Sequence, residues 1–350
     1  MNELYVGVDI GSVSINIVAI DKSKETRFKL YERNTGSPVD VVKDGLSRLG
    51  KKLGNTYRVA GVGVTGSGRQ LIGTIIGADV IKNEITAHAI ATIEQVPDVG
   101  TIFEIGGQDS KLIIVQNEVV TNFAMNSVCA AGTGSFLDHQ AQRLGVRIDE
   151  LGRLALQSTR DVRIAGRCTV FAESDMVSKQ QYGFTKPEII NGLCEALVRN
   201  YMNNLVRGRE LHPRFVFQGG VAANEGIKAA IENEIGQEVI IPDNFDVMGA
   251  LGGALLARDH MLESGDDTSF RGFEVAEDVF ETSTFICDDC ANECEVIRIL
   301  SNGRTIAMTG DRCNKWSDSP PEDEIPRPES DNVACAGNGL GVNCAKEQGV

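Results

Sequence analysis

Residues 4–20 read LYVGVDIGSVSINIVAI, a stretch that predicts two antiparallel strands joined by a tight hairpin. The strands are expected over 4–11 and 13–20, and a third over 26–32 completes a β-meander. The first turn carries an acidic side chain beside small residues whose backbone N–H groups suit phosphate oxygens. These turn residues are Asp9, Gly11, Ser12 and Ser14.

The same pattern returns further along the chain. Strands are predicted over 100–105, 111–116 and 119–123, and the first two are joined by the turn Gly106-Gly107-Gln108-Asp109. Two meanders, each with an acidic Gly-rich hairpin, indicate an internal duplication. The first meander is followed by a helix over 39–53, a strand over 58–64 and helices over 70–76 and 84–94. The second half continues through helices over 170–181 and 188–207, a strand over 214–221, a helix over 223–234, a strand over 238–241 and a helix over 247–261.

This order of elements predicts an α/β protein with two duplicated βββαβα lobes. We expect the first lobe over 1–98, completed by the helix 247–262, and the second over 99–246. A Cys-rich module is predicted over 263–316, and the acidic, Pro-rich residues 317–350 are expected to be disordered.

The composition excludes several classes of protein. The 350 residues carry a net charge of −15, and most of it lies in the last quarter of the chain. Residues 1–262 have 27 basic and 30 acidic side chains, whereas residues 263–350 have 7 and 19. Without a basic face the chain does not look like a nucleic-acid binder. No export signal or membrane-length apolar run is recognisable, and nine cysteines, an odd number, indicate thiols or metal ligands in a reducing cytoplasm.

Three Gly-rich turns predict a nucleotide in a cleft between the lobes. Asp9 and Asp109 would lie across from each other and could hold Mg²⁺, largely through its waters. The hairpin N–H groups would contact phosphates, and Gly219-Gly220, which ends a strand, would let a flat purine approach the backbone.

Two cysteines stand just ahead of predicted helices. Residues 125–145, MNSVCAAGTGSFLDHQAQRLG, put Cys129 in a run of small residues before an amphipathic helix that Gly145 ends. Cys168 precedes the helix over 170–181. Two thiols are half the ligands of a cubane cluster, and a two-fold dimer would supply the other half. On spacing alone a reactive thiol, a metal ligand and a buried structural cysteine all stay open.

Five segments together resemble the ATP-dependent activators of 2-hydroxyacyl-CoA dehydratases, a group that includes the ATPase subunits of benzoyl-CoA reductase. They are DIGS (9–12), EIGGQD (104–109), NSVCAAGTGSFLD (126–138), CTVFAES (168–174) and FQGGVAAN (217–224). The resemblance covers roughly residues 3–262 in continuous order.

The resemblance implies an actin-like, sugar-kinase-like ATPase fold and a homodimer bridged by one 4Fe–4S cluster, held by Cys129 and Cys168 of each subunit. ATP hydrolysis with Mg²⁺ would gate the transfer of one low-potential electron to an iron–sulfur dehydratase or reductase, with ferredoxin or flavodoxin as the donor. The implied catalytic residues are Asp9, Glu104, Gln108 and Asp109. The implied ATP contacts are Gly11, Ser12, Ser14, Gly106, Gly107, Gly219 and Gly220.

Three positions depart from the family pattern. Glu104 stands where Asp is usual, Asn16 where a Lys is common, and Arg167 where a small hydroxyl residue is more usual. Glu104 would add a methylene group that could shift a water or Mg²⁺ contact, and Asn16 would remove a possible phosphate contact. Arg167 would add a positive charge beside the cluster. We therefore expect slower hydrolysis, or a less reducing electron, than in the family at large.

The remaining cysteines suggest a second metal site. Cys287, Cys290 and Cys294 have knuckle-like spacing, and Cys313 follows in a small strand-rich module. Zn²⁺ and a second iron–sulfur cluster both stay open, as does a metal-free set of thiols. Cys194 and His88 are predicted to be structural helix residues, and Cys335 and Cys344 could be ligands or have no role.

Two other functions compete with the activator. A small-molecule kinase on the same fold would need a carboxylate base beside a substrate pocket, which the sequence does not reveal. A non-catalytic sensor would use ATP and the tail metal to regulate a partner. The paired cysteine motifs favour the activator, because fold alone does not choose among these functions.

Overall fold

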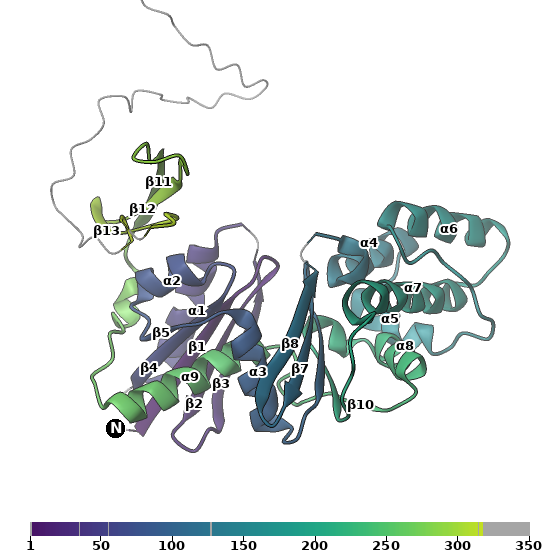
Figure 1. Ribbon diagram of the computed structural model, residues 1–350, viewed down its shortest axis with the longest axis horizontal. Coiled ribbons are helices and arrows are strands. Elements are labelled where there is room, and N and C mark those ends of the chain that lie inside the picture. The colour runs from purple at the N-terminus through teal and green to yellow at the C-terminus, as the bar shows by residue number, and fades with distance from the viewer. Residues whose placement is uncertain (1, 35, 55, 127, 314, 318–350) are drawn as a thin grey trace, which may run out of the picture. The chain divides into compact units, whose positions relative to one another are not determined.

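The computed structural model describes residues 2–34, 36–54, 56–126, 128–313 and 315–317. The chain divides into a larger compact unit that ends at Glu281 and a smaller one that begins at Thr282. The larger unit contains two α/β lobes, each built on a five-stranded mixed sheet (Figure 1). The duplicated two-lobed architecture that the sequence predicts is confirmed.

The first lobe is built on the N-terminal meander. Its sheet has the order β3-β2-β1-β4-β5, antiparallel among the first three strands and parallel from β1 to β5. The strands are β1 (Asn2–Ile10), β2 (Ser14–Asp21), β3 (Thr26–Arg33), β4 (Tyr57–Gly66) and β5 (Val80–Ile81). The helices are α1 (Pro38–Leu53), α2 (Arg69–Ile76) and α3 (Glu84–Gln95). Strand β2 is almost wholly buried, as its mainly apolar sequence predicts.

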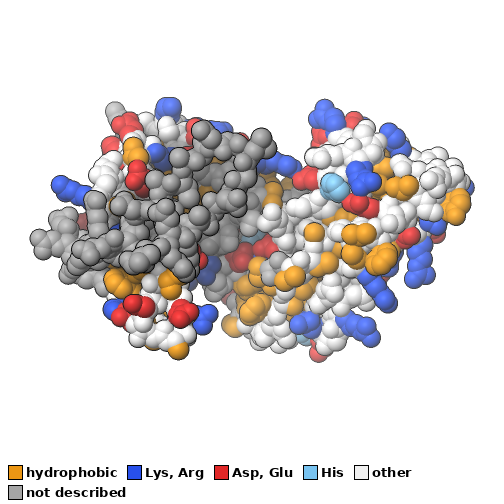
Figure 2. Space-filling model, turned by 90° about the horizontal axis from the view of Figure 1, so that it is seen from above, with side chains coloured by type: hydrophobic (Ala, Val, Ile, Leu, Met, Phe, Trp, Pro, Cys, Tyr) orange, Lys and Arg blue, Asp and Glu red, His pale blue; other side chains and the backbone are white. Residues whose placement is uncertain are grey.

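The second lobe repeats this plan. Its sheet has the order β10-β9-β6-β7-β8, with the meander β6-β7-β8 antiparallel and β9 and β10 parallel to β6. The strands are β6 (Thr101–Ile105), β7 (Ser110–Gln116), β8 (Val119–Asn126), β9 (Phe215–Gln218) and β10 (Val239–Ile240). The edge strand β8 leaves Val119 and Phe123 exposed. Figure 2 shows hydrophobic side chains on the surface of this lobe.

Helices surround the second sheet. They are α4 (Gly134–Leu144), α5 (Leu151–Ala155), α6 (Thr169–Gln181), α7 (Lys186–Tyr201) and α8 (Glu225–Ile235), with short turns η1 (Ala130–Gly132), η2 (Ile148–Glu150), η3 (Met202–Val206) and η4 (Gly220–Ala223). The predicted strand 214–221 is too long, because the chain turns at Gly219, where φ is +89°. The predicted helix 188–207 also changes character, since it continues beyond Tyr201 as the π-helical turn η3.

Helix α9 (Met248–Ser264) returns to the first lobe and completes it, as predicted. It lies directly on the backbone of the sheet. A β-carbon added at Gly7 would lie 1.8 Å from the Ala250 carbonyl oxygen, and one at Gly63 would lie 2.0 Å from that of Gly253. Only glycine fits at both positions, because backbone meets backbone there. The small residues of α9 therefore serve close packing.

The larger unit extends beyond the predicted boundary at residue 262. Residues 268–278 pack along the first lobe: Thr268 Oγ1 donates to Asp79 Oδ2 at 2.7 Å, and Lys43 Nζ donates to the Asp278 carbonyl oxygen at 2.6 Å. Val275, in the turn η5 (Phe273–Ala276), is 3% exposed. These contacts assign the segment to the first lobe, and a truncation should therefore follow Glu281.

The smaller unit contains a three-stranded sheet of β11 (Phe280–Ile286), β12 (Glu295–Ser301) and β13 (Arg304–Thr309). Val296 and Met308 form its small core together with Cys287. The acidic tail predicted to be disordered lies, apart from Ser317, outside the described residues. None of the helices in the described part of the chain is long and apolar enough to cross a membrane.

Candidate functional site

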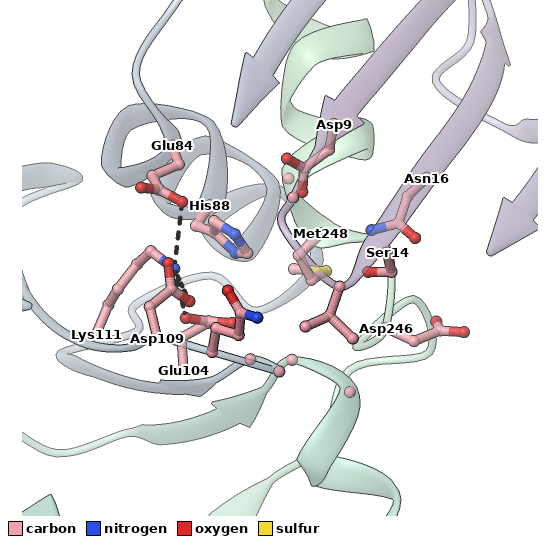
Figure 3. Close-up of a pocket in the computed structure, with 18 of the residues that line it drawn as sticks. Asp9, Ser14, Asn16, Glu84, His88, Glu104, Asp109, Lys111, Asp246 and Met248 are labelled. Atoms are coloured by element: carbon pink, nitrogen blue, oxygen red, sulfur yellow. Dashed lines mark hydrogen bonds and ion pairs between the residues drawn. The ribbon is translucent and has the colours of Figure 1, made fainter. Parts of the chain in front are cut away.

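A cleft of about 240 Å³ lies between the two lobes of the larger unit. All eleven residues predicted to bind or hydrolyse the nucleotide line it. From the first lobe these are Asp9, Gly11, Ser12 and Ser14; from the second, Glu104, Gly106, Gly107, Gln108, Asp109, Gly219 and Gly220. Figure 3 shows Asp9 on one side of this pocket and Glu104 and Asp109 on the other.

The two predicted hairpins close in the same way. The Gly11 N–H donates to the Ser14 carbonyl oxygen and the Gly106 N–H to that of Asp109, both at 3.0 Å. The hairpin tips touch, because a β-carbon added at Gly107 would lie 2.6 Å from Val13 Cβ. The duplication seen in the sequence therefore extends to the geometry of the two turns.

The carboxylate of Asp9 lies against two glycines, Gly66 and Gly249, where a larger residue would collide with it. A β-carbon at Gly249, in the first turn of α9, would lie 2.2 Å from Asp9 Oδ2, and one at Gly66 would lie 2.6 Å from Oδ1. Burial raises the pKa of Asp9 to about 7; Lys111 opposes this shift, and Glu84 and Asp109 add to it. Asp9 can therefore change protonation near neutral pH.

A buried ammonium group sits among the acids of the cleft. Lys111 is 2% exposed, and its Nζ lies 2.9 Å from Glu104 Oε2, 2.9 Å from Asp109 Oδ1 and 3.3 Å from Glu84 Oε2 (Figure 3). Burial alone would lower the pKa of Lys111, but the three carboxylates outweigh it and raise the pKa above its usual range. Lys111 therefore stays charged and offsets part of the negative charge that gathers there.

Glu104 fills the position where the family pattern has Asp. Burial raises its pKa to about 8, although the ion pair with Lys111 acts in the opposite direction. A β-carbon added at Gly219 would lie 2.7 Å from Glu104 Oε1, so the longer side chain reaches the Gly219-Gly220 turn. Asn16, at a position where a Lys is common in the family pattern, is buried at the cleft with no hydrogen-bond partner for Oδ1 among the described residues.

His88 lines the cleft but is held by structural contacts, as predicted. Its Nδ1 lies 3.0 Å from Gln218 Nε2, and Gln218 Oε1 accepts a hydrogen bond from Thr92 Oγ1 at 2.7 Å. Burial lowers the pKa of His88 to about 3, so the ring stays neutral. The His88–Gln218 pair thereby joins α3 to β9.

The segment after Cys129 is hydrogen-bonded to the second hairpin. The Gly134 N–H donates to the Gly106 carbonyl oxygen at 2.9 Å and the Ser135 N–H to that of Gly107 at 2.8 Å. Ser135 Oγ also donates to the Gly107 carbonyl oxygen at 2.6 Å. The first N–H groups of α4 are thus already used within the protein, and the turn predicted to face a phosphate is tied to the start of this helix.

Cys168 is the N-cap residue of α6, as its sequence position predicts. Cys129 precedes the small residues of the short turn η1, and the predicted helix that follows them, α4, begins at Gly134. Its backbone is held by Asn126, whose Oδ1 accepts from the Cys129 N–H at 3.0 Å and whose Nδ2 donates to its carbonyl oxygen at 2.9 Å. Both thiols are free and partly exposed, and Arg167 beside Cys168 is exposed.

The four tail cysteines that the structure describes do not form a closed site. Cys287 is buried with Sγ 3.2 Å from Asp289 Oδ2, Cys294 is partly exposed, and Cys290 and Cys313 are exposed. Within the described ranges, no three His, Cys, Asp or Glu side chains are grouped so that they could hold a metal ion. The tail metal therefore stays a prediction from cysteine spacing. Cys194 is fully buried, and burial raises its pKa to about 12, which confirms a core role; Cys335 and Cys344 lie outside the described residues.

Three charged residues that line the cleft were missed by the sequence analysis: Glu84, Lys111 and Asp246. Lys111 lies on β7, two residues after Asp109, which directly precedes that strand. A lone Lys in the apolar run SKLIIV was the available signal. Glu84 offered none, because its position at the start of α3 is ordinary for a helix.

Comparison with known proteins agrees with this geometry. Residues 6–257 match the BadF/BadG/BcrA/BcrD ATPase family. The (R)-2-hydroxyglutaryl-CoA dehydratase activating ATPase of Acidaminococcus fermentans is 36% identical over 261 residues, which are 73% of this chain and 98% of that protein. The 2-hydroxyisocaproyl-CoA dehydratase activator of Clostridioides difficile is 35% identical over 263 residues, 74% of this chain and 96% of the relative.

A solved structure extends the likeness to the fold. The activator of the 2-hydroxyisocaproyl-CoA dehydratase from Clostridium difficile, with bound ADPNP, gives a TM-score of 0.69 at 33% identity. The match covers 75% of this chain and 97% of that one. The predicted actin-like ATPase fold is confirmed, and the chain belongs to the BadF/BadG/BcrA/BcrD family of ATPases.

Proposed function

We propose that this ATPase hydrolyses Mg-ATP in the cleft and uses it to deliver one electron to an iron–sulfur partner such as a 2-hydroxyacyl-CoA dehydratase. The observation that carries the proposal is the direct hydrogen bonding between the Gly106-Gly107 hairpin and the start of α4, just after Cys129. Relatives named as dehydratase activators support the choice of partner.

The cleft offers what an ATPase needs. The N–H groups of the two hairpins would contact the phosphates, and Asp9 and Asp109 would hold Mg²⁺, largely through its waters. Glu104 and Gln108 would orient the attacking water, and Gly219-Gly220 would leave room for the purine. Lys111 would offset part of the carboxylate charge that otherwise repels a phosphate.

The two cysteine segments fit a shared cluster. Both thiols are accessible, and each stands at the start of a helical turn. The side chains around them are exposed and apolar: Val128 is 96% exposed, Val170 64% and Phe171 65%. Such a patch is suited to an interface. We propose a homodimer in which Cys129 and Cys168 of both subunits hold one 4Fe–4S cluster, which supplies one-electron chemistry.

Nucleotide and cluster would be coupled through the hairpin. A change at the Gly106-Gly107 turn on ATP binding or hydrolysis would be passed to Gly134 and Ser135 and so to the Cys129 segment. Ion pairs between the lobes would respond too, because Arg33 of β3 lies 3.1 Å from Asp138 of α4. This is a hinge-type coupling between two bodies that close on a ligand.

The remaining assignments follow from the same proposal. Reduced ferredoxin or flavodoxin would supply the electron, and a reducing cytoplasm suits a chain whose described cysteines are all free. The cysteines of the tail would bind Zn²⁺ or a second cluster. The rival small-molecule kinase would transfer the γ-phosphate to an acceptor hydroxyl, whereas the activator transfers it to water.

The proposal is tested by reconstitution. The anaerobic, dithionite-reduced protein is mixed with a 2-hydroxyglutaryl-CoA dehydratase that lacks its own activator, and dehydration is followed with and without ATP. Activation that requires ATP is the expected result, with ADP and a nonhydrolysable analogue inactive. Phosphorylation of an acceptor in the absence of any dehydratase would instead support the kinase.

Binding of Mg-ATP should weaken as pH falls, because the pKa of Asp9 is raised to about 7. Above this pH Asp9 is charged and suited to Mg²⁺; below it a proton must leave before the metal binds. From pH 8 to pH 6 the Kd should rise by about tenfold for one such proton. Calorimetry with an ATP analogue measures this Kd at each pH.

Asp9→Asn is the control for that measurement. It should bind more weakly than the wild type at pH 8 and lose most of the pH dependence. A wild-type Kd that stays constant from pH 6 to pH 8 would contradict the role given to Asp9.

A further inference from the structure

We propose that Asn200 is a positioning residue that holds the Cys129 and Cys168 segments at a fixed separation. The inference deepens the proposed function, because it rests on those two cysteines holding the cluster. Asn200 stands in the last turn of α7 and is 3% exposed. A buried amide must satisfy its hydrogen bonds inside the protein. This one donates to a carbonyl oxygen just before Cys168, and its oxygen packs against the turn that follows Cys129.

The first contact is with the Cys168 segment. Asn200 Nδ2 donates to the Gly166 carbonyl oxygen at 2.6 Å, two residues before Cys168. Gly166 is pressed onto α7, since a β-carbon there would lie 2.7 Å from the Ala196 carbonyl oxygen. Arg199 adds a second tie through Nη2, which donates to the Ile164 carbonyl oxygen at 2.8 Å. The approach to Cys168 is therefore fixed to one turn of α7.

The second contact is with the Cys129 segment. A β-carbon added at Gly132, three residues after Cys129, would lie 2.8 Å from Asn200 Oδ1 and 3.5 Å from Asn126 Nδ2. Asn126 is the residue that holds the backbone of Cys129 on both sides. Asn200 Oδ1 thus lies against Gly132, and Asn126, which lies beside the same glycine, holds the backbone of Cys129.

The π-helical turn orients this amide. Asn204 Nδ2 donates to Asn200 Oδ1 at 3.0 Å, and Asn204 lies within η3. Such turns are frequent at functional sites in helices. The next residue, Tyr201, donates its hydroxyl to the Lys111 carbonyl oxygen at 2.7 Å. One turn of α7 therefore contacts the two cysteine segments and the strand that carries the buried lysine of the cleft.

Residues that hold metal ligands in place are part of a metal site, and their loss typically costs about 10–100-fold in metal affinity. Asn200→Asp keeps the shape but replaces the Nδ2 donor by an oxygen. Asn200→Ala removes both contacts, and Gly132→Ala pushes on the amide from the other side. The matched control is Asn203→Asp, because Asn203 is exposed on the same turn and its Nδ2 donates to the Arg199 carbonyl oxygen.

Two measurements on the full-length protein test the proposal. In the anaerobic holoprotein, all three variants should lose iron to a ferrous chelator at least about tenfold faster than the wild type and the Asn203→Asp control. Their ATP hydrolysis should stay close to that of the wild type. In the iron-free protein, hydrogen exchange should rise in residues 129–133 and 165–168 together in the Asn200 variants, and in the control it should not.

The outcomes separate this inference from the proposed function. Wild-type protein that holds no iron would overturn the bridging cluster. The hydrogen-exchange experiment would still test whether Asn200 holds the two cysteine segments in place. Iron loss at the wild-type rate in both Asn200 variants, or unchanged exchange in the two segments, would overturn the positioning role. If the Asn200 variants lost ATPase activity together with iron and unfolded at a lower midpoint, Asn200 would only stabilise the lobe.

Discussion

Cys129→Ser and Cys168→Ser should each leave the anaerobically purified protein with almost no iron, whereas the wild type should hold about four irons per dimer. Each substitution removes two of the four thiolates, because the proposed two-fold axis doubles every change. A hydroxyl group is a poor replacement for a thiolate on iron. The readouts are iron and acid-labile sulfide per dimer, and the visible absorption of the cluster. In air the wild-type absorption should bleach, because both thiols are partly exposed in the subunit.

The chain offers controls for this experiment. Cys194→Ala alters a thiol in the core of the second lobe, and it should keep the full iron content. Tail thiols confuse an iron count, so it is repeated on a chain truncated after Glu281, where the larger compact unit ends. Metal present in the full-length chain and absent from the truncated one would belong to the tail, and its identity would decide between Zn²⁺ and iron.

Two outcomes would contradict the bridging site. A complete cluster in an isolated monomer would mean that one chain supplies all the ligands. Iron retained in the truncated Cys168→Ser protein would remove Cys168 from the ligand set. The kinase hypothesis would then come first, since it needs the cleft but not the cysteines.

The fold was largely predictable because its signals are local. The mainly apolar runs of the meanders and the Gly-rich hairpins mark strands and turns without reference to the rest of the chain. The return of α9 to the first lobe was predicted too, and it has a clear physical basis in Gly7 and Gly63. The boundary at Glu281 was not, because residues 268–278 have no periodic pattern and are held by single hydrogen bonds and by Val275.

The sequence predicted only those residues of the candidate site that belong to short motifs. The hairpin residues stand in short recognisable segments, and all of them line the cleft. Lys111 and Glu84 meet across the lobes from strand β7 and helix α3, a long-range contact that no local pattern encodes. Asn200 is hidden for the same reason: its partners Gly166 and Gly132 lie far from it in the sequence. The small residues between Cys129 and the predicted helix form a 3-10 turn, and α4 begins after it.

Asp109→Ala should abolish Mg-ATP hydrolysis, and Asp109→Asn should lower kcat by about 10²–10⁴-fold, the range of a lost acid–base or metal-positioning group. The Asp109 carboxylate is partly exposed at the cleft, where it would contact the waters of Mg²⁺. The hairpin itself should survive, because the Gly106 N–H donates to the backbone carbonyl of Asp109 and not to its side chain. Phosphate release under steady-state conditions measures kcat, and calorimetry with an ATP analogue measures binding.

The fold of this variant should also survive, and the reason lies in Lys111. Removing every partner of a buried charge costs about 3–5 kcal/mol. Asp109→Asn leaves Lys111 paired with Glu104 at 2.9 Å and Glu84 at 3.3 Å, so the ammonium group is not stranded. Asp259→Asn, which removes an exposed carboxylate on α9, is the matched control and should hydrolyse ATP normally. Normal turnover in both Asp109 variants would remove this residue from the catalytic set. Lost turnover with a normal unfolding midpoint and a full iron content would show that the charge of Asp109 acts on the nucleotide and not on the architecture.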